Sequence, residues 1–301
     1  MPDPTPTPAP ILTPSAPLPV VELLQVGPAP DLAIEVPHGA TSLAEYRGLR
    51  AHLRGALPDD LEAFFCVNTD AGAPEVARAL ADRRAARGRG TLIVRCRVPR
   101  TFVDCNRELD PARPPAQVGG ITPGMAPYIR DSADRELLFD LHHRYLAATA
   151  AALEPVMAAG GQALLLHTYA PRSVDVVVDD QIVPALRAAW ADPGRWPLRP
   201  EADLIGQLPD GRWDVDAEAR AAMVQAFAEE GLQLTLGATY PLHPVTVAHR
   251  WATRWPGRVR CVELRRDLLA DPWRPFDEQR ISAAAAARFA RALQRALDGE
   301  A

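Results

Sequence analysis

The sequence contains no lysine, so all 33 of its basic residues are arginine. This excludes enzymes that depend on a Schiff-base lysine, on a lysine that binds pyridoxal phosphate, or on the lysine of a P-loop. No apolar run approaches the roughly 20 residues that a membrane-spanning helix requires, so we expect no membrane partner. A G-x-S-x-G segment is also absent, which argues against a serine hydrolase of that type.

The sequence also lacks an excess of basic residues. Its 33 basic side chains are outnumbered by 38 acidic ones, which gives a formal net charge of −5. Nucleic-acid-binding domains usually carry a basic excess or stripe, so we expect no nucleic-acid partner. The four cysteines form no CxxC pair. Three of them, Cys66, Cys96 and Cys261, lie in apolar runs that predict strands and packed thiols. The N-terminus lacks the features of a secretory signal, and we expect a reduced, cytoplasmic protein.

Proline dominates the start of the chain, where ten of the first thirty residues are proline. Such composition favours an extended, flexible tail, which we place at residues 1–20. Residues 21–301 are then long enough for one α/β domain with its own core. The segment 172–213 is strand-like in places but has no clear pattern. The tail could also serve as a proline-rich ligand, although a solvated tail is the simpler interpretation.

Apolar runs alternate with amphipathic segments of ten or more residues from residue 32 onward. The runs that predict strands are LAIEVPHG, LEAFFCVN, TLIVRCRV, QALLLHTY, LQLTLGATYP and RVRCVELRRDLL. Amphipathic helices are predicted after most of them, with a Ser cap before the first and Pro near the start of the second. Alternation of this kind indicates a mixed, mainly parallel sheet with helices on both faces.

Polar side chains follow several of these runs, at the sheet edge where α/β proteins bind ligands. They are His38, Asp70, Asp104, Asn106, Arg107, His167 and Glu263. Two histidines and a carboxylate can form a zinc site with an open fourth position, and a further carboxylate can act as general base.

Each of these residues also has a plain structural interpretation. Asp70 can cap the following helix, and a lone histidine after a strand is often a hydrogen-bonded loop residue. Glu263 lies inside an apolar run, so burial would be costly unless it pairs with an arginine or takes part in chemistry. Asn106 and Arg107 suit recognition of a carboxylate but could equally form a loop ion pair.

Together, the order of these segments resembles the N-formylglutamate amidohydrolase family, within the zinc-carboxypeptidase-like hydrolases. The resemblance spans residues from about 31 to 270. It is carried by five segments, Pro37-His38-Gly39, Asp70-Ala71-Gly72-Ala73, Arg100 with Asp104-Cys105-Asn106-Arg107, His167-Thr168-Tyr169 and Val262-Glu263-Leu264-Arg265. Thr41 stands where the wider group has the Glu of its His-x-x-Glu pair.

The resemblance implies a zinc-carboxypeptidase-like fold and hydrolysis of the amide of an N-acyl acidic amino acid, such as N-formylglutamate, by metal-activated water. It assigns Zn²⁺, or another divalent metal, to His38, Asp70 and His167, with Glu45 as the alternative to Asp70. Glu263 becomes the general base. The residues assigned to a small-molecule N-acyl amino acid substrate are Arg100, Asn106, Arg107 and Arg265.

Two alternatives stay open from the sequence. One is a carboxypeptidase-like or deacylase activity on another N-acyl amino acid or peptide, and the other is a non-catalytic binding module. Among the remaining histidines, His52, His142 and His143 are expected on helices as packing or surface residues. His243 and His249, which precede Glu263, could line the site or stabilise an oxyanion.

Overall fold

The computed structural model describes residues 18–109 and 123–299. Within these two ranges, seven strands form one sheet. Their bounds are β1 (Val21–Val26), β2 (Pro30–Val36), β3 (Gly90–Cys96), β4 (Gln162–Tyr169), β5 (Ala202–Leu204), β6 (Leu234–Leu236) and β7 (Val259–Arg265). The predicted tail lies outside the described residues as far as residue 17. Its last residues, 18–20, are held in place, since Val20 is buried and its carbonyl accepts the Arg97 N–H at 2.9 Å.

The strand order is β1-β3-β2-β4-β7-β5-β6. The four central strands β3, β2, β4 and β7 run parallel, whereas β1 pairs antiparallel with β3 and β5 antiparallel with β7. The predicted mixed, mainly parallel sheet is therefore confirmed. In the β4–β7 pair His167 stands opposite Glu263, so the two side chains lie next to each other at the carboxyl end of the central strands.

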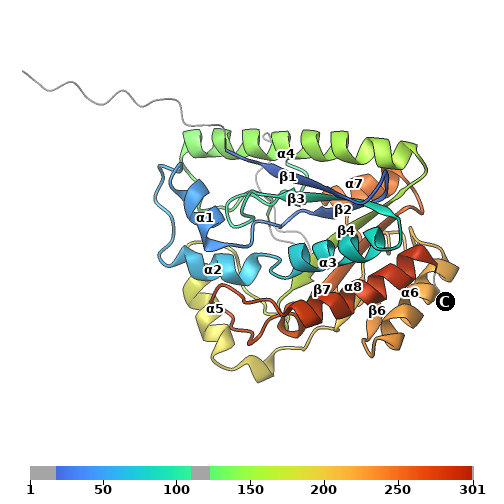
Figure 1. Cartoon of the computed structure of the whole chain (residues 1–301). Helices are drawn as coiled ribbons and strands as arrows, with labels where there is room; N and C mark the ends of the chain where they lie inside the picture. Colours follow the sequence, from blue (N-terminus) through green and yellow to red (C-terminus); the bar gives the residue numbers. More distant parts are fainter. Residues whose placement is uncertain (1–17, 110–122, 300–301) are drawn as a thin grey trace, which may run out of the picture.

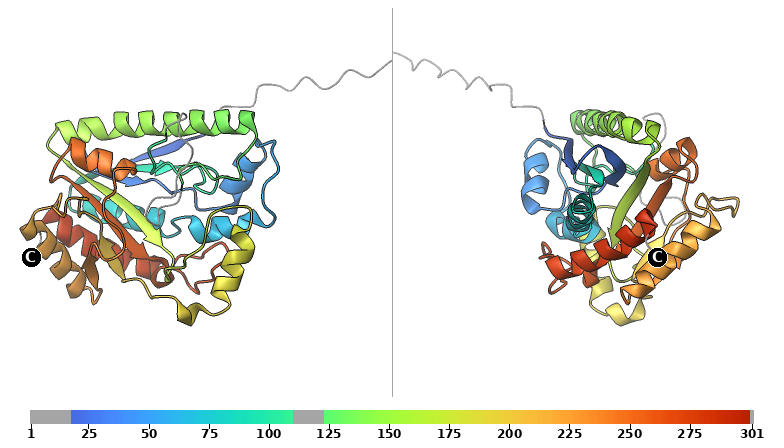
Figure 2. Two further views of the ribbon diagram at one scale, coloured as in Figure 1. Left: turned by 180° about the vertical axis from the view of Figure 1, so that it is seen from behind. Right: turned by 45° about the vertical axis from the view of Figure 1, so that its right-hand side comes forward.

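Helices cover both faces of this sheet (Figures 1 and 2). One apolar core lies between the sheet and α3, α6 and α8. The other lies on the opposite face and includes side chains of α1, α2, α4, α5 and α7. The helix bounds are α1 (Leu43–Arg50), α2 (Leu61–Asn68), α3 (Ala73–Ala85), α4 (Ser132–Ala158), α5 (Ile182–Trp190), α6 (Ala217–Glu229), α7 (Val247–Arg254) and α8 (Ala283–Asp298).

The run LEAFFCVN was predicted as a strand and is the helix α2 instead. Leu61, Phe64 and Phe65 are all buried, and Cys66 beside them is buried as well. A short apolar run that is buried on several sides has no clear period, so length and composition alone favoured a strand. All four cysteines are buried and unpaired, as packing thiols should be, with Cys66 on a helix rather than a strand.

The segment 172–213, which the sequence left unassigned, contains α5, the 3₁₀ turn Pro193–Arg195 and β5. The sequence also missed β1, an antiparallel edge strand whose residues are mostly exposed or half-buried. Within the described part of the chain, no helix combines the length and apolarity needed to cross a membrane.

Candidate metal centre

Three candidate ligands come from loops and strand ends at the carboxyl edge of the sheet. His38 follows β2, Asp70 lies between α2 and α3, and His167 is near the end of β4. The turn after His38 requires glycine, because a Cβ at Gly39 would lie 2.6 Å from Arg95 Cγ. Asp70 does not cap α3, because the N-cap of that helix is Gly72. Gly72 has a positive φ of 97°, and a Cβ added at this position would lie only 2.7 Å from Leu269 Cδ1.

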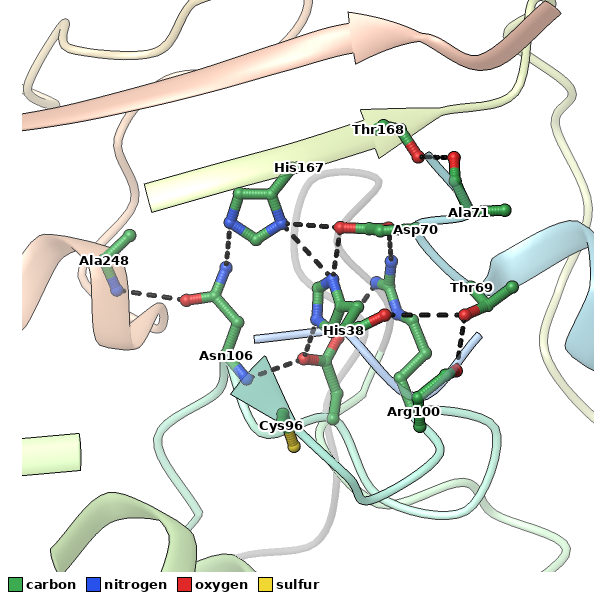
Figure 3. A network of polar contacts seen from close by, with 12 residues as sticks. His38, Thr69, Asp70, Ala71, Cys96, Arg100, Asn106, His167, Thr168 and Ala248 are labelled. Atoms are coloured by element: carbon green, nitrogen blue, oxygen red, sulfur yellow. Dashed lines mark hydrogen bonds and ion pairs between the residues drawn. The ribbon is translucent and has the colours of Figure 1, made fainter. Parts of the chain in front are cut away.

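These loops bring His38, Asp70 and His167 together (Figure 3). Asp70 Oδ2 lies 3.1 Å from His38 Nδ1 and 2.9 Å from His167 Nδ1. The two Nδ1 atoms are 3.3 Å apart. All three side chains are almost fully buried, with 1–3% of their side-chain surface exposed.

The three atoms form a triangle that fits a tetrahedral zinc ion. Zinc bonds of about 2.0–2.1 Å place neighbouring ligand atoms roughly 3.3 Å apart. Two imidazole nitrogens and a carboxylate oxygen at these spacings repel one another unless a proton or a cation lies between them. Among the described residues this is the one group of three such side chains whose ligand atoms all lie within 4.8 Å.

The charges of the cluster also suit a bound cation. Burial would lower the pKa of His167, but Asp70, Cys261 and the Glu263 carboxylate together outweigh burial and raise that pKa well above its ordinary value. Burial would raise the pKa of Asp70, yet the two histidines hold it far below its usual range. The cluster therefore retains a carboxylate anion in a buried site, which is the charge that a divalent cation requires.

Asp104 lies behind the triangle and orients His38. Its Oδ1 lies 2.7 Å from His38 Nε2 and accepts the Asn106 backbone N–H at 2.9 Å. Its Oδ2 accepts from Arg100 at 2.9 Å and lies 3.5 Å from Arg107 Nη2. A histidine that donates Nε2–H to a carboxylate presents the lone pair of Nδ1, as a metal ligand must. Burial would raise the pKa of Asp104, but Arg107, His38 and Arg100 keep it well below its usual value.

Glu263 is a further carboxylate beside the cluster, on β7 and in register with His167. As predicted from strand alternation, Val262 and Leu264 point to the opposite face, where they belong to the other core. Glu263 lines the cavity next to the triangle, and its Oε2 has no hydrogen-bond partner among the described residues. Burial raises its pKa, and His167 and Asp70 act on it in opposite directions.

A cavity of about 250 Å³ opens next to the cluster, lined by His38, His167 and Glu263. Among the residues that the structure describes, five arginines line this cavity, against two carboxylates, those of Asp104 and Glu263. The arginines are Arg100, Arg107, Arg172, Arg199 and Arg266. The excess of positive charge suits an anionic ligand.

The arginines that line the cavity differ in how freely they can contact a ligand. Arg266 is 2% exposed and donates to the carbonyls of Val67 and Thr168 and to the Thr168 hydroxyl, so it holds the loop that carries Asp70. Arg199 stacks over Tyr169 at 5.2 Å and donates to Tyr240 Oη at 2.7 Å. Neither Arg199 nor Tyr240 was among the predicted site residues. Arg199 lies in the unassigned segment 172–213, whereas Tyr240 ends the predicted strand run LQLTLGATYP, and that position could have singled it out.

The remaining predicted site residues have different positions. Arg265 is not among the residues that line the cavity; its guanidinium donates to Asp267 at 2.9 Å and to the Arg199 carbonyl at 3.0 Å. Glu45, the alternative to Asp70, closes a capping box on α1 and pairs with Arg95 and Arg97.

Three further side chains complete this account. Asn106 lines the cavity, with Nδ2 3.5 Å from His167 Nε2 and Oδ1 accepting the Ala248 N–H at 3.0 Å. His243 and His249 are half-buried and do not line the cavity. The His243 Nδ1 accepts the Val245 N–H at 3.1 Å, which is a local turn contact.

Fold and site place the chain among α/β proteins in which a candidate metal site opens onto an arginine-lined cavity. Its sequence matches the N-formylglutamate amidohydrolase family over residues 31–270, and the chain belongs to that family. The family identifies it as an amidohydrolase-type protein. Comparison with the curated proteins gives no match.

Solved structures share the fold. A gene product of Agrobacterium tumefaciens is 18% identical, with a TM-score of 0.54 over 93% of this chain and 94% of that one. An N-formylglutamate amidohydrolase from Ralstonia eutropha is 16% identical, with a TM-score of 0.58 over 93% of this chain and 96% of that one. At these identities the likeness shows a common fold alone.

Proposed function

We propose that this protein hydrolyses the amide bond of an N-acyl acidic amino acid, such as N-formylglutamate, with the help of one divalent metal ion, most suitably Zn²⁺. The observation that carries the proposal is the triangle of His38 Nδ1, His167 Nδ1 and Asp70 Oδ2, with edges of 2.9–3.3 Å, beside an arginine-lined cavity. When bound there, zinc would supply a Lewis acid for the scissile carbonyl and for an attacking water.

The chain's own residues have separate tasks in this proposal. Glu263 Oε2, which has no partner among the described residues, accepts the proton of the attacking water and passes it to the leaving amine. Arg107 and Arg100 bind one carboxylate of the substrate, with Asn106 beside them. Arg199, on a different segment, is placed to bind the second carboxylate of an acidic amino acid.

Metal analysis and hydrolysis together test the proposal. The purified chain is expected to carry about one zinc per chain and to release formate from N-formylglutamate. His167→Ala removes one corner of the triangle, and the variant is expected to lose both metal and activity. His52→Ala, on an exposed position, is the matched control and is expected to keep both. A zinc-loaded chain that hydrolyses no N-acyl acidic amino acid would overturn the proposal.

A further inference from the structure

Part of the cavity lining is apolar, in addition to its arginines. Val67 and Phe64 of α2 and Leu186 and Trp190 of α5 belong to this apolar part, together with Val174 and Val178 from the loop before α5. Helices α2 and α5 pack against each other, so these side chains form one continuous wall. We call the six residues the apolar wall.

The apolar wall lines the same cavity as the candidate ligands His38 and His167. Asn68, which ends α2, also lines the cavity, and its Oδ1 accepts the Thr101 hydroxyl at 2.9 Å, next to Arg100. Asp70 follows two residues later in the chain. A group attached to the reacting carbonyl can therefore lie against the wall while the carbonyl is at the metal.

A substrate with only polar ends would leave this wall without a partner. Glutamate supplies two carboxylates for the arginines, and a formyl group adds a single carbon. Carboxylates placed against valine and leucine would lose water without gaining hydrogen bonds, which is unfavourable. An aliphatic or aromatic acyl group would instead bury its own apolar surface together with that of the wall.

We infer that the acyl group taken by this site is larger than formyl, a medium-length aliphatic or an aromatic acyl chain on an acidic amino acid. This inference rests on the proposed function and narrows its substrate class. The segment that supplies Val174, Val178, Leu186 and Trp190 is the one the sequence left unassigned, so the acyl preference is set outside the segments that carry the family resemblance.

A series of N-acylglutamates tests the inference with the zinc-loaded chain. From formyl through acetyl and butanoyl to hexanoyl, kcat/KM is expected to rise about fourfold for each methylene that becomes buried, from about 0.8 kcal/mol per methylene. N-benzoylglutamate is expected to exceed N-formylglutamate as well. A series in which N-formylglutamate is hydrolysed fastest overturns the inference and leaves the amidohydrolase proposal standing.

Two valines give a matched pair of variants. Val178 is 8% exposed and lines the cavity, whereas its neighbour Val177 is 60% exposed and does not. Val178→Thr keeps the shape but adds a hydroxyl to the wall, and is expected to lower the hexanoyl-to-formyl ratio of kcat/KM at least fivefold, for a cost of about 1 kcal/mol. Val177→Thr is expected to leave that ratio within about twofold.

If Val178→Thr fails to fold, Val174→Thr, at a half-buried position of the same wall, serves in its place. A binding measurement tests the acyl-group inference independently of the proposed hydrolysis. Calorimetry with the metal-depleted chain is expected to show tighter binding of N-hexanoylglutamate than of N-formylglutamate, with a negative heat-capacity change. Tighter binding without hydrolysis by the zinc-loaded chain supports the inference and overturns the proposed function. Equal binding of the two ligands overturns the inference.

Discussion

Replacing Asp104 by asparagine is expected to weaken metal binding although none of the three proposed metal ligands is substituted. The carboxylate is 3% exposed and is shared by His38, Arg100, Arg107 and the Asn106 N–H. Asparagine keeps one acceptor oxygen but turns the other into an NH₂ group. If the oxygen stays on His38, the NH₂ group faces Arg100; if the amide flips, it faces the Nε2–H of His38. Either orientation places donor against donor.

The size of the effect follows from these contacts. Loss of a carboxylate that orients a ligating histidine costs about 10–100-fold in metal affinity. Breaking a buried ion pair costs about 3–5 kcal/mol when the remaining charge is fully buried. Arg100 is 20% exposed and Arg107 10%, so water partly solvates both. We therefore expect about 2 kcal/mol of lost stability, or roughly 3 °C in the melting temperature of a chain of this size.

Zinc affinity is best measured by competition with a chelator, and stability by thermal unfolding of the metal-free chain. Asp82→Asn is the matched control, because Asp82 pairs with Arg78 on an exposed helix surface with 49% of its side chain accessible. That variant is expected to change neither zinc affinity nor, beyond about 0.5 kcal/mol, stability. If Asp104→Asn binds zinc within twofold of the parent chain, Asp104 does not orient His38 for the metal and the reasoning fails.

Two other substitutions test separate parts of the site. Glu263→Gln keeps the shape but removes the base, so bound zinc is expected to persist while kcat falls roughly 10²–10⁴-fold; loss of the metal would instead make Glu263 a ligand. Glu35, 1% exposed, accepts the Tyr145 hydroxyl at 2.8 Å, and burial raises its pKa. Because a raised pKa in the folded state costs stability once the pH exceeds the ordinary glutamate value of about 4.3, Glu35→Gln is expected to stabilise the metal-free chain at pH 8 but hardly at pH 4. A melting-temperature difference that stays constant between those pH values would contradict this.

Local pattern was sufficient for much of the sheet. The parallel strands β2, β3 and β4 each contain a short apolar run (LAI, LIV and ALLL) because helices cover both faces of the sheet, and such runs stand out in a sequence. Their carboxyl ends meet at one edge, so the polar residues after each run, His38, His167 and Glu263 among them, could be predicted to lie together. This prediction used only the order of the strands and the identity of the polar residues at their ends.

Tertiary structure decided what local pattern could not. Asp70 and Glu45 are both carboxylates near the first histidine, and only the packing of α1 shows that Glu45 is taken up by a capping box and two arginines. Arg265 and Arg199 carry the same charge, yet Asp267 holds the first outside the cavity while Tyr169 and Tyr240 hold the second at its wall. The apolar wall joins α2, a loop and α5 from segments more than 100 residues apart. Which partner a charged side chain binds, and which distant segments touch, depends on three-dimensional packing. The local pattern of apolar and polar residues does not contain that information.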